Sequence, residues 1–146
     1  MELPQLIRGG AAVDDRGGLG FVNEFVLDDF RRMYVVSNHR AGFIRAWHGH
    51  RFERKAAVVV SGAAVVAAVA IDDWASPSPS AQVHRFVLSE RAPSALIIPA
   101  GYANGFMSLT ANTRICFFSS STLEESAADD IRFPAQLWDP WTIEER

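Results

Sequence analysis

Short runs of β-branched and aromatic residues recur along this chain at intervals of about ten residues, separated by Gly, Pro, Asn, Asp and Ser. Each run has the length of one strand, and none shows the 3.6-residue periodicity of an amphipathic helix. The sequence therefore predicts an all-β jelly roll. The expected strands cover residues 19–26, 32–37, 43–48, 83–88, 95–98, 105–109 and 113–118.

The longest apolar stretch runs from Ala56 to Ile71, is rich in valine and is interrupted by a Ser-Gly pair at 61–62. We expect two buried strands joined by a turn, because valine favours strands and the stretch is shorter than the roughly 20 residues of a membrane-spanning helix. The segment 72–81 is rich in Ser and Pro and is expected to be a loop. A short helix is expected from Thr122, where Glu125 completes a capping box.

Length and composition indicate one domain, residues 1–146, because 146 residues that are 49% hydrophobic suffice for one buried core. A net charge of −3 lacks the basic footprint of a nucleic-acid-binding protein. The single cysteine, Cys116, excludes an internal disulfide and indicates a reducing compartment. The N-terminal residues lack the basic and apolar regions of a signal peptide. We therefore expect a cytoplasmic protein that binds neither nucleic acid nor membrane.

Two histidines, His48 and His50, form a His-Gly-His sequence at the end of the strand expected over 43–48. Residues two apart on a strand share a face, so both imidazoles are expected to point the same way. Two imidazoles that converge inside a barrel can bind a metal ion or transfer protons. The alternative is that one or both simply belong to a polar core. A lysine that follows closely favours the chemical interpretation.

That lysine, Lys55, is the only lysine among the 14 Lys and Arg residues of the chain. A compact ammonium suits the stabilisation of a localised developing charge, whereas a guanidinium suits planar, bidentate recognition. Strict alternation from His50 would turn Lys55 outward, so an inward position requires residues 51–54 to form a turn. A chance lysine, or one that extends to the surface, is the alternative.

The segment from Gly42 to Gly62 resembles the first motif of the cupins, in which Gly, His-x-His, Glu and Gly follow one another at set spacings. Lys55 stands where that family has its glutamate. The second motif is matched by Pro99-Ala-Gly-Tyr-Ala-Asn104, with Asn104 in place of a histidine. The resemblance implies a cupin jelly roll without two of the four metal ligands. One of these is replaced by a cation that repels a divalent ion, so no metal and no other cofactor is expected.

Further segments are similar to a metal-free group of cupins, the dTDP-4-dehydrorhamnose 3,5-epimerases. These segments are Asp15-Arg16-Gly17 with Glu24, Arg45-Ala-Trp-His48, Ile98 to Phe106, and Trp138-Asp139-Pro140. Residues 31–36 and the short loop before Lys55 are instead similar to the dTDP-4-keto-6-deoxyhexose 3,4-ketoisomerases. Together the resemblances span most of the chain and imply an isomerase or epimerase of a nucleotide-linked 4-keto-6-deoxyhexose.

The ketone of such a substrate acidifies the hydrogens on the neighbouring carbons, and removal of one leaves an enolate with its charge on the ketone oxygen. We expect His48 to be the general base, since imidazole titrates near neutral pH. Lys55 is expected to stabilise the oxyanion. His50, beside His48, suits the proton relay of a 3,4-ketoisomerisation.

The expected substrate is a nucleotide-diphosphate sugar, and the arginine fork of Arg45 suits its diphosphate. Edges of small sheets are often paired across a two-fold axis, so a homodimer is expected. The resemblance assigns Arg16 and Glu24 to the nucleotide, across that dimer interface. Substrate contacts are therefore expected from Arg45, Arg16, Glu24, Asn104 and Phe117.

Two departures from the epimerases leave other functions open. The tyrosine that protonates the opposite face of the sugar in that family is Phe117 here, so water, Tyr102 or another group would have to supply the proton. The C-terminal aspartate that orients the histidine has no counterpart in the sequence. A non-catalytic cupin that binds a nucleotide sugar is one alternative. A metal site formed by His48, His50 and Glu53 is another.

Overall fold

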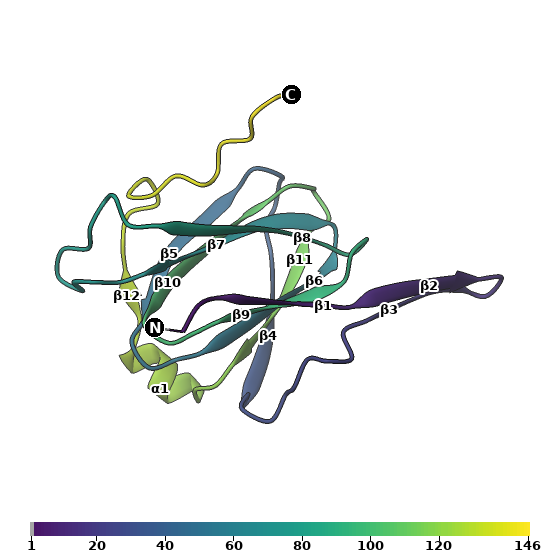
Figure 1. Ribbon diagram of the computed structural model, residues 1–146, viewed down its shortest axis with the longest axis horizontal. Coiled ribbons are helices and arrows are strands. Elements are labelled where there is room, and N and C mark those ends of the chain that lie inside the picture. The colour runs from purple at the N-terminus through teal and green to yellow at the C-terminus, as the bar shows by residue number, and fades with distance from the viewer. Residues whose placement is uncertain (1) are drawn as a thin grey trace.

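The computed structural model describes residues 2–146, which fold into two facing five-stranded antiparallel sheets and a separate hairpin (Figure 1). The first sheet has the order β1-β9-β6-β11-β4, the second has the order β12-β5-β10-β7-β8, and β2 pairs only with β3. This architecture confirms the predicted all-β jelly roll. The elements are β1 (Gln5–Arg8), β2 (Gly10–Asp14), β3 (Gly17–Phe21), β4 (Arg32–Ser37), β5 (Ile44–His50), β6 (Lys55–Ser61), β7 (Ala63–Ala70), β8 (Val83–Ser89), β9 (Ser94–Ile98), β10 (Tyr102–Ser108), β11 (Arg114–Ser119), α1 (Leu123–Ala128) and β12 (Ile131–Arg132).

Several local predictions are confirmed. The segment 32–37 is β4, β6 ends at Ser61 of the Ser-Gly pair and β7 begins after Gly62, and residues 72–81 form a loop. The capping box is present: the Thr122 hydroxyl accepts from the Glu125 amide at 3.2 Å, and the Glu125 carboxylate accepts from the Thr122 amide at 3.1 Å. None of the helical segments in residues 2–146 is long and apolar enough to cross a membrane.

The structure differs from the prediction mainly in its short strands. The strand expected over 19–26 ends at Phe21, because the chain turns there and the amide of Phe25 donates to the carbonyl of Val22. Strands β1, β2 and β12 were not predicted. They contain only four, five and two residues and are fixed by pairing with distant segments or, for β2, with the adjacent β3. Such pairing leaves little signal in local composition.

The inward face of the first sheet changes from polar to apolar along its strands. Alternate residues of a strand share a face, so strand register arranges the inward side chains in rows. The first row is polar, the second is largely aromatic and the third is aliphatic. In register across β6, β11 and β4, the rows are Lys55, Ser119 and Arg32; Ala57, Phe117 and Tyr34; and Val59, Ile115 and Val36.

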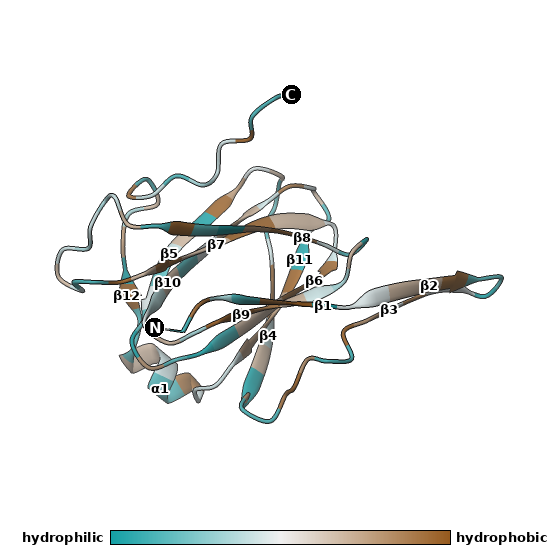
Figure 2. Ribbon diagram, in the orientation of Figure 1, coloured by the Kyte–Doolittle hydropathy of each residue, from teal (hydrophilic) through white to brown (hydrophobic). Residues whose placement is uncertain are grey.

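Strand β5 of the second sheet is covered on both faces. Trp47 is fully buried on the outer face, where it packs against Trp138 and Trp141 of the C-terminal segment, with ring centroids 5.3 and 5.2 Å apart. Gly49 lies on that face too, and a Cβ atom there would be 2.8 Å from the Trp74 ring. Glycine is thus the residue that fits between the two histidines, which point to the opposite, inward face. Figure 2 shows the apolar stretches of the neighbouring strands.

Candidate active site

A cavity of about 170 Å³ lies between the two sheets. The first sheet contributes Tyr34, Val36, Lys55 and Phe117, and the second contributes Arg45, His48, Asn104 and Phe106. A neighbouring cavity of about 250 Å³ shares His48 and Lys55 and is also lined by His50, Leu123, Ser126, Ala127, Asp130 and Arg132. The base and the cation expected from the sequence therefore form a common wall of both cavities.

The two histidines face inward from β5, as strand alternation predicts. His50 is buried, and its Nδ1 lies 2.8 Å from the backbone carbonyl of Asp129. A carbonyl can only accept, so Nδ1 carries the hydrogen and Nε2 of the neutral ring holds a lone pair. This buried Nε2 has no hydrogen-bond partner within residues 2–146. His48 is only partly buried, and its backbone carbonyl accepts a hydrogen bond from the side-chain amide of Asn104 at 3.3 Å.

The surroundings keep both imidazoles neutral. Burial lowers the pKa of His48 below its ordinary 6.5, and the charges of Arg132 and Lys55 lower it further. Burial and then the charge of Lys55 likewise lower the pKa of His50. A neutral imidazole is the form that accepts a proton, so both rings are competent as bases near pH 7.

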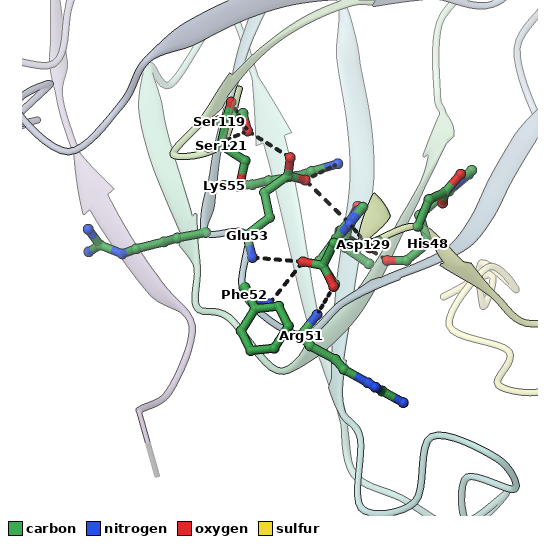
Figure 3. Close-up of polar contacts among 12 residues, drawn as sticks. His48, Arg51, Phe52, Glu53, Lys55, Ser119, Ser121 and Asp129 are labelled. Atoms are coloured by element: carbon green, nitrogen blue, oxygen red, sulfur yellow. Dashed lines mark hydrogen bonds and ion pairs between the residues drawn. The ribbon is translucent and has the colours of Figure 1, made fainter. Parts of the chain in front are cut away.

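Lys55 reaches the cavity because residues 51–54 leave the strand geometry. The Asp129 carboxylate accepts from three successive amides in this segment, those of Arg51 at 2.8 Å, Phe52 at 2.9 Å and Glu53 at 3.1 Å (Figure 3). The chain then enters β6 with Lys55 buried against the cavity. The inward position that the sequence required of Lys55 is therefore confirmed.

The Lys55 ammonium has two partners in the structure. Its Nζ lies 3.1 Å from the Tyr34 hydroxyl and 3.4 Å from Oε2 of Glu53. An ammonium can only donate, so the Tyr34 oxygen accepts and keeps its own hydrogen available for another group. An ammonium carries three hydrogens, so Lys55 can donate to a substrate oxygen while it donates to Tyr34.

Tyr34 was not singled out by the sequence as a site residue. It belongs to β4, stacks on Phe117 with a centroid separation of 5.4 Å and an interplanar angle of 20°, and lines the same cavity as His48. Tyr102 lies outside both cavities, and its hydroxyl donates to the backbone carbonyl of Glu2 at 2.8 Å. The phenol at the site is therefore Tyr34, one strand away from the position where the epimerases have theirs.

Comparison with known proteins identifies the family. Residues 15–140 match the sequence model of the dTDP-4-dehydrorhamnose 3,5-epimerase family. The chain belongs to this family. No curated protein sequence matches it.

Solved structures share the fold of this family member. The dTDP-4-dehydrorhamnose 3,5-epimerase of Bacillus anthracis, solved with TDP and PPi bound, is 24% identical with a TM-score of 0.77, over 97% of this chain and 86% of that one. The rmlC epimerase of Mycobacterium tuberculosis is 20% identical with a TM-score of 0.74, over 94% and 71%. The WlaRB TDP-quinovose 3,4-ketoisomerase of Campylobacter jejuni is 17% identical with a TM-score of 0.68, over 94% and 98%. As a member of the dTDP-4-dehydrorhamnose 3,5-epimerase family, the chain is a nucleotide-sugar isomerase or epimerase.

The metal-site alternative has no support in the geometry of this epimerase-family chain. Within residues 2–146, no three His, Cys, Asp or Glu side chains are grouped so that they could hold a metal ion. Glu53, the third ligand of that hypothesis, is buried with Oε2 3.4 Å from the Lys55 ammonium and 3.4 Å from Nδ1 of His50. Its carboxylate is thus paired with protein cations and hydrogen-bond donors.

Of the predicted substrate contacts, Arg45, Asn104 and Phe117 line the cavity. A register shift between Asn104 and Phe106 sets Arg45 opposite Phe106, and the Arg45 Nε donates to Oδ1 of Asn38 at 2.8 Å. The substrate roles of these residues in the family member stay predictions.

Arg16 and Glu24 lie outside both cavities of their own chain. Arg16 occupies the turn of the β2–β3 hairpin and pairs with Asp14, and Glu24 is exposed after β3. Figure 1 shows this hairpin projecting from the body of the epimerase fold. The substrate contacts expected of Arg16 and Glu24 therefore stay predictions.

Proposed function

We propose that the chain epimerises a carbon next to the ketone of a dTDP-linked 4-keto-6-deoxyhexose, with His48 as the base and Tyr34 as the acid. One observation carries the proposal: His48 and Tyr34 line the same cavity from opposite sheets. Inversion needs proton removal on one face of the sugar and proton delivery on the other. This arrangement provides a basic nitrogen and a phenol on opposing walls.

The proposed reaction has two proton transfers. His48 takes the hydrogen from C3 or C5 as a proton, the C–H electron pair forms the C=C bond, and the ketone oxygen becomes an enolate. Lys55 donates a hydrogen bond to this oxygen, where the negative charge develops. Tyr34 then protonates the carbon from the other face, and the ketone re-forms. The Lys55 ammonium stabilises the resulting phenolate until both residues exchange protons with solvent.

A 3,4-ketoisomerisation is the second candidate. It moves a proton between neighbouring atoms of the sugar through an enediol. His48 and His50 line the cavity of about 250 Å³ together, and Nε2 of His50 has no hydrogen-bond partner among residues 2–146. This pair of imidazoles is the observation that favours the second candidate.

Replacing Tyr34 by Phe tests which reaction occurs. We expect deuterium from heavy water to enter C3 or C5 of dTDP-4-keto-6-deoxyglucose in the variant, because His48 can still remove and return a proton. The epimerised product, measured by proton NMR, should fall by on the order of 10²-fold, since the opposite-face acid is lost.

Tyr102→Phe is the matched control, because it removes a phenol that lies outside the cavities. Its epimerisation rate should stay within about twofold of the unchanged protein. Undiminished inversion in Tyr34→Phe would reject Tyr34 as the acid. A 3-keto product without inversion would establish the second candidate, and no exchange in the unchanged protein would leave only ligand binding.

We further propose a homodimer in which the β2–β3 hairpin of one chain completes the site of the other. The hairpin buries little against its own chain: Val13 is 84% exposed and Leu19 is 64% exposed. Its apolar surface borders a cavity of about 590 Å³ that is also lined by Val58 and Val60 of β6. An apolar arm of this kind suits a second copy of the chain. A cytoplasmic location stays a prediction that rests on the single cysteine.

Mixing two inactive variants tests the shared site. Arg16→Ala and His48→Asn are each expected to be impaired alone. If Arg16 acts on the partner's cavity, a mixed dimer contains one unaltered site, so activity should return to roughly a quarter of the normal value after subunit exchange. Sedimentation should give twice the chain mass of 16.1 kDa. A monomer, or a mixture without recovery, contradicts the shared site.

A further inference from the structure

We propose that Glu53 is a positioning residue that joins the Lys55 ammonium and the His50 imidazole into one electrostatic unit at the active site. The inference builds on the proposed function, because it assigns a role to a buried carboxylate that the two proton transfers do not use. It also supplies an acidic partner for a histidine of the site.

The position of the Glu53 carboxylate is the first support. Its side chain has no exposed surface, and Oε2 lies 3.4 Å both from Nζ of Lys55 and from Nδ1 of His50. The other oxygen, Oε1, accepts from the Ser119 hydroxyl at 2.8 Å and lies 3.4 Å from a guanidinium nitrogen of Arg32. One oxygen therefore anchors the carboxylate to the first sheet, and the other faces the two site residues.

The charge of Glu53 is the second support. A buried carboxylate is costly unless it is paired. Burial alone raises its pKa, but the Ser126 side chain, the Lys55 charge and the Ser119 hydroxyl outweigh burial and hold the pKa of Glu53 below its ordinary 4.5. The residue is therefore an anion at neutral pH. An anion at this point attracts the Lys55 ammonium and favours proton uptake by His50.

The groups around Glu53 come from five elements. Arg32 is on β4, His50 on β5, Lys55 on β6, Ser119 on β11 and Ser126 on α1. Arg32 and Lys55 are the cations on this set of elements that the carboxylate contacts, and Asp129 holds the Glu53 amide at 3.1 Å. With Glu53 neutral, the two cations would face each other without an anion between them. We therefore expect the ammonium to leave its position beside Tyr34.

The His50 ring is held in one orientation by the same network. Its Nδ1–H points at the Asp129 carbonyl, with the Glu53 carboxylate at 3.4 Å on the same edge of the ring. Nε2 is thereby directed away from these acceptors, into a part of the site where no group of residues 2–146 forms a hydrogen bond with it. Glu53 thus favours a ring whose free nitrogen can exchange a proton.

The test is Glu53→Gln, which removes the charge and keeps the shape. We expect kcat to fall by on the order of 10²-fold through displacement of Lys55. KM should change less than about threefold, because Glu53 lines neither of the two cavities that contain His48. Histidine NMR should show a higher titration midpoint for His50, because the Lys55 ammonium that is displaced lowers the pKa of that ring more than the Glu53 carboxylate raises it.

The single lysine provides a readout that needs no substrate. In protein labelled with ¹⁵N-lysine, the ammonium of Lys55 should give one signal that is protected from exchange with water, and the signal should disappear in Glu53→Gln. Loss of this signal together with an unaltered fold by amide NMR supports the proposal, whether or not the proposed reaction is found.

Two further variants complete the design. Glu53→Asp keeps the charge, so the His50 midpoint should return most of the way to that of the unchanged protein. Glu124→Gln removes an exposed carboxylate from α1 and should alter neither signal. An unprotected Lys55 signal in the unchanged protein would overturn the proposal without any variant. A Glu53→Gln protein with unchanged kcat and an unchanged His50 midpoint would overturn it equally.

Discussion

Replacement of His48 by Asn should reduce deuterium incorporation at C3 and C5 of the keto sugar by about 10²- to 10⁴-fold, because His48 is the only imidazole that lines the cavity shared with Tyr34 within residues 2–146. Mass spectrometry of substrate incubated in heavy water measures this exchange without requiring turnover. Asparagine keeps a polar side chain of similar size, so the cavity should retain its shape.

His39→Asn is the matched control for this experiment. His39 is exposed and lines neither cavity, and its loss should leave exchange within about twofold of normal. The unchanged protein should also show a pH profile for kcat/KM whose acid limb lies below pH 6.5, since the pKa of His48 is lowered and the neutral ring is the base. Full exchange in His48→Asn would remove the base assignment.

Replacement of Lys55 by Met should lower kcat by roughly 10²- to 10³-fold, the usual effect of losing one donor to a developing oxyanion. Methionine fills similar space and cannot stabilise negative charge. Deuterium exchange should fall in parallel with turnover, because Lys55 acts on the enolate that both processes share. Binding of dTDP, measured by calorimetry, should change far less.

Lys55→Arg separates charge from shape in the same position. A guanidinium keeps the positive charge but spreads it over a planar fork, so we expect activity between those of Lys55→Met and the unchanged protein. Thermal melts of the three proteins should be compared, because Glu53 loses a partner in the methionine variant. A Lys55→Met enzyme within tenfold of normal turnover would show that the ammonium does not stabilise the transition state.

Much of the fold and the first half of the site follow from local sequence. The strand pattern predicts the sandwich, and the two-residue spacing of His48 and His50 places both imidazoles on one face. The inward position of Lys55 could not be predicted from strand alternation alone. It depends on a break in the strand that is held by Asp129, 76 to 78 residues away from the amides it binds.

The rest of the site depends on register between strands that are distant in the sequence. Tyr34 meets Lys55 because β4 and β6 both pair with β11, which aligns Tyr34 with Phe117 and Arg32 with Ser119. No local motif contains this information. The one available signal was the alternation in β4, which predicts that Arg32, Tyr34 and Val36 share a face.

Glu53 illustrates a different limit of sequence reasoning. A glutamate in an Arg-Phe-Glu-Arg segment resembles a solvated loop residue. It also lies three residues after His50, so strand alternation would place its side chain on the opposite face from the two histidines, which disfavours a shared metal ion. Its burial results from the turn at 51–54, which directs it between the two sheets. The charge pairing could be recognised only once Arg32, His50 and Lys55 were known to surround it.

The contacts of Asp129 also connect the site to the far end of the fold. One carbonyl and one carboxylate of this residue accept from four donors that lie 76 to 79 residues earlier in the sequence. Asp129 is the residue that ends α1, so the bend that turns Lys55 toward the two imidazoles is held from the end of this helix. The geometry of the site therefore depends on the packing of α1, although the helix contributes neither histidine nor lysine to it.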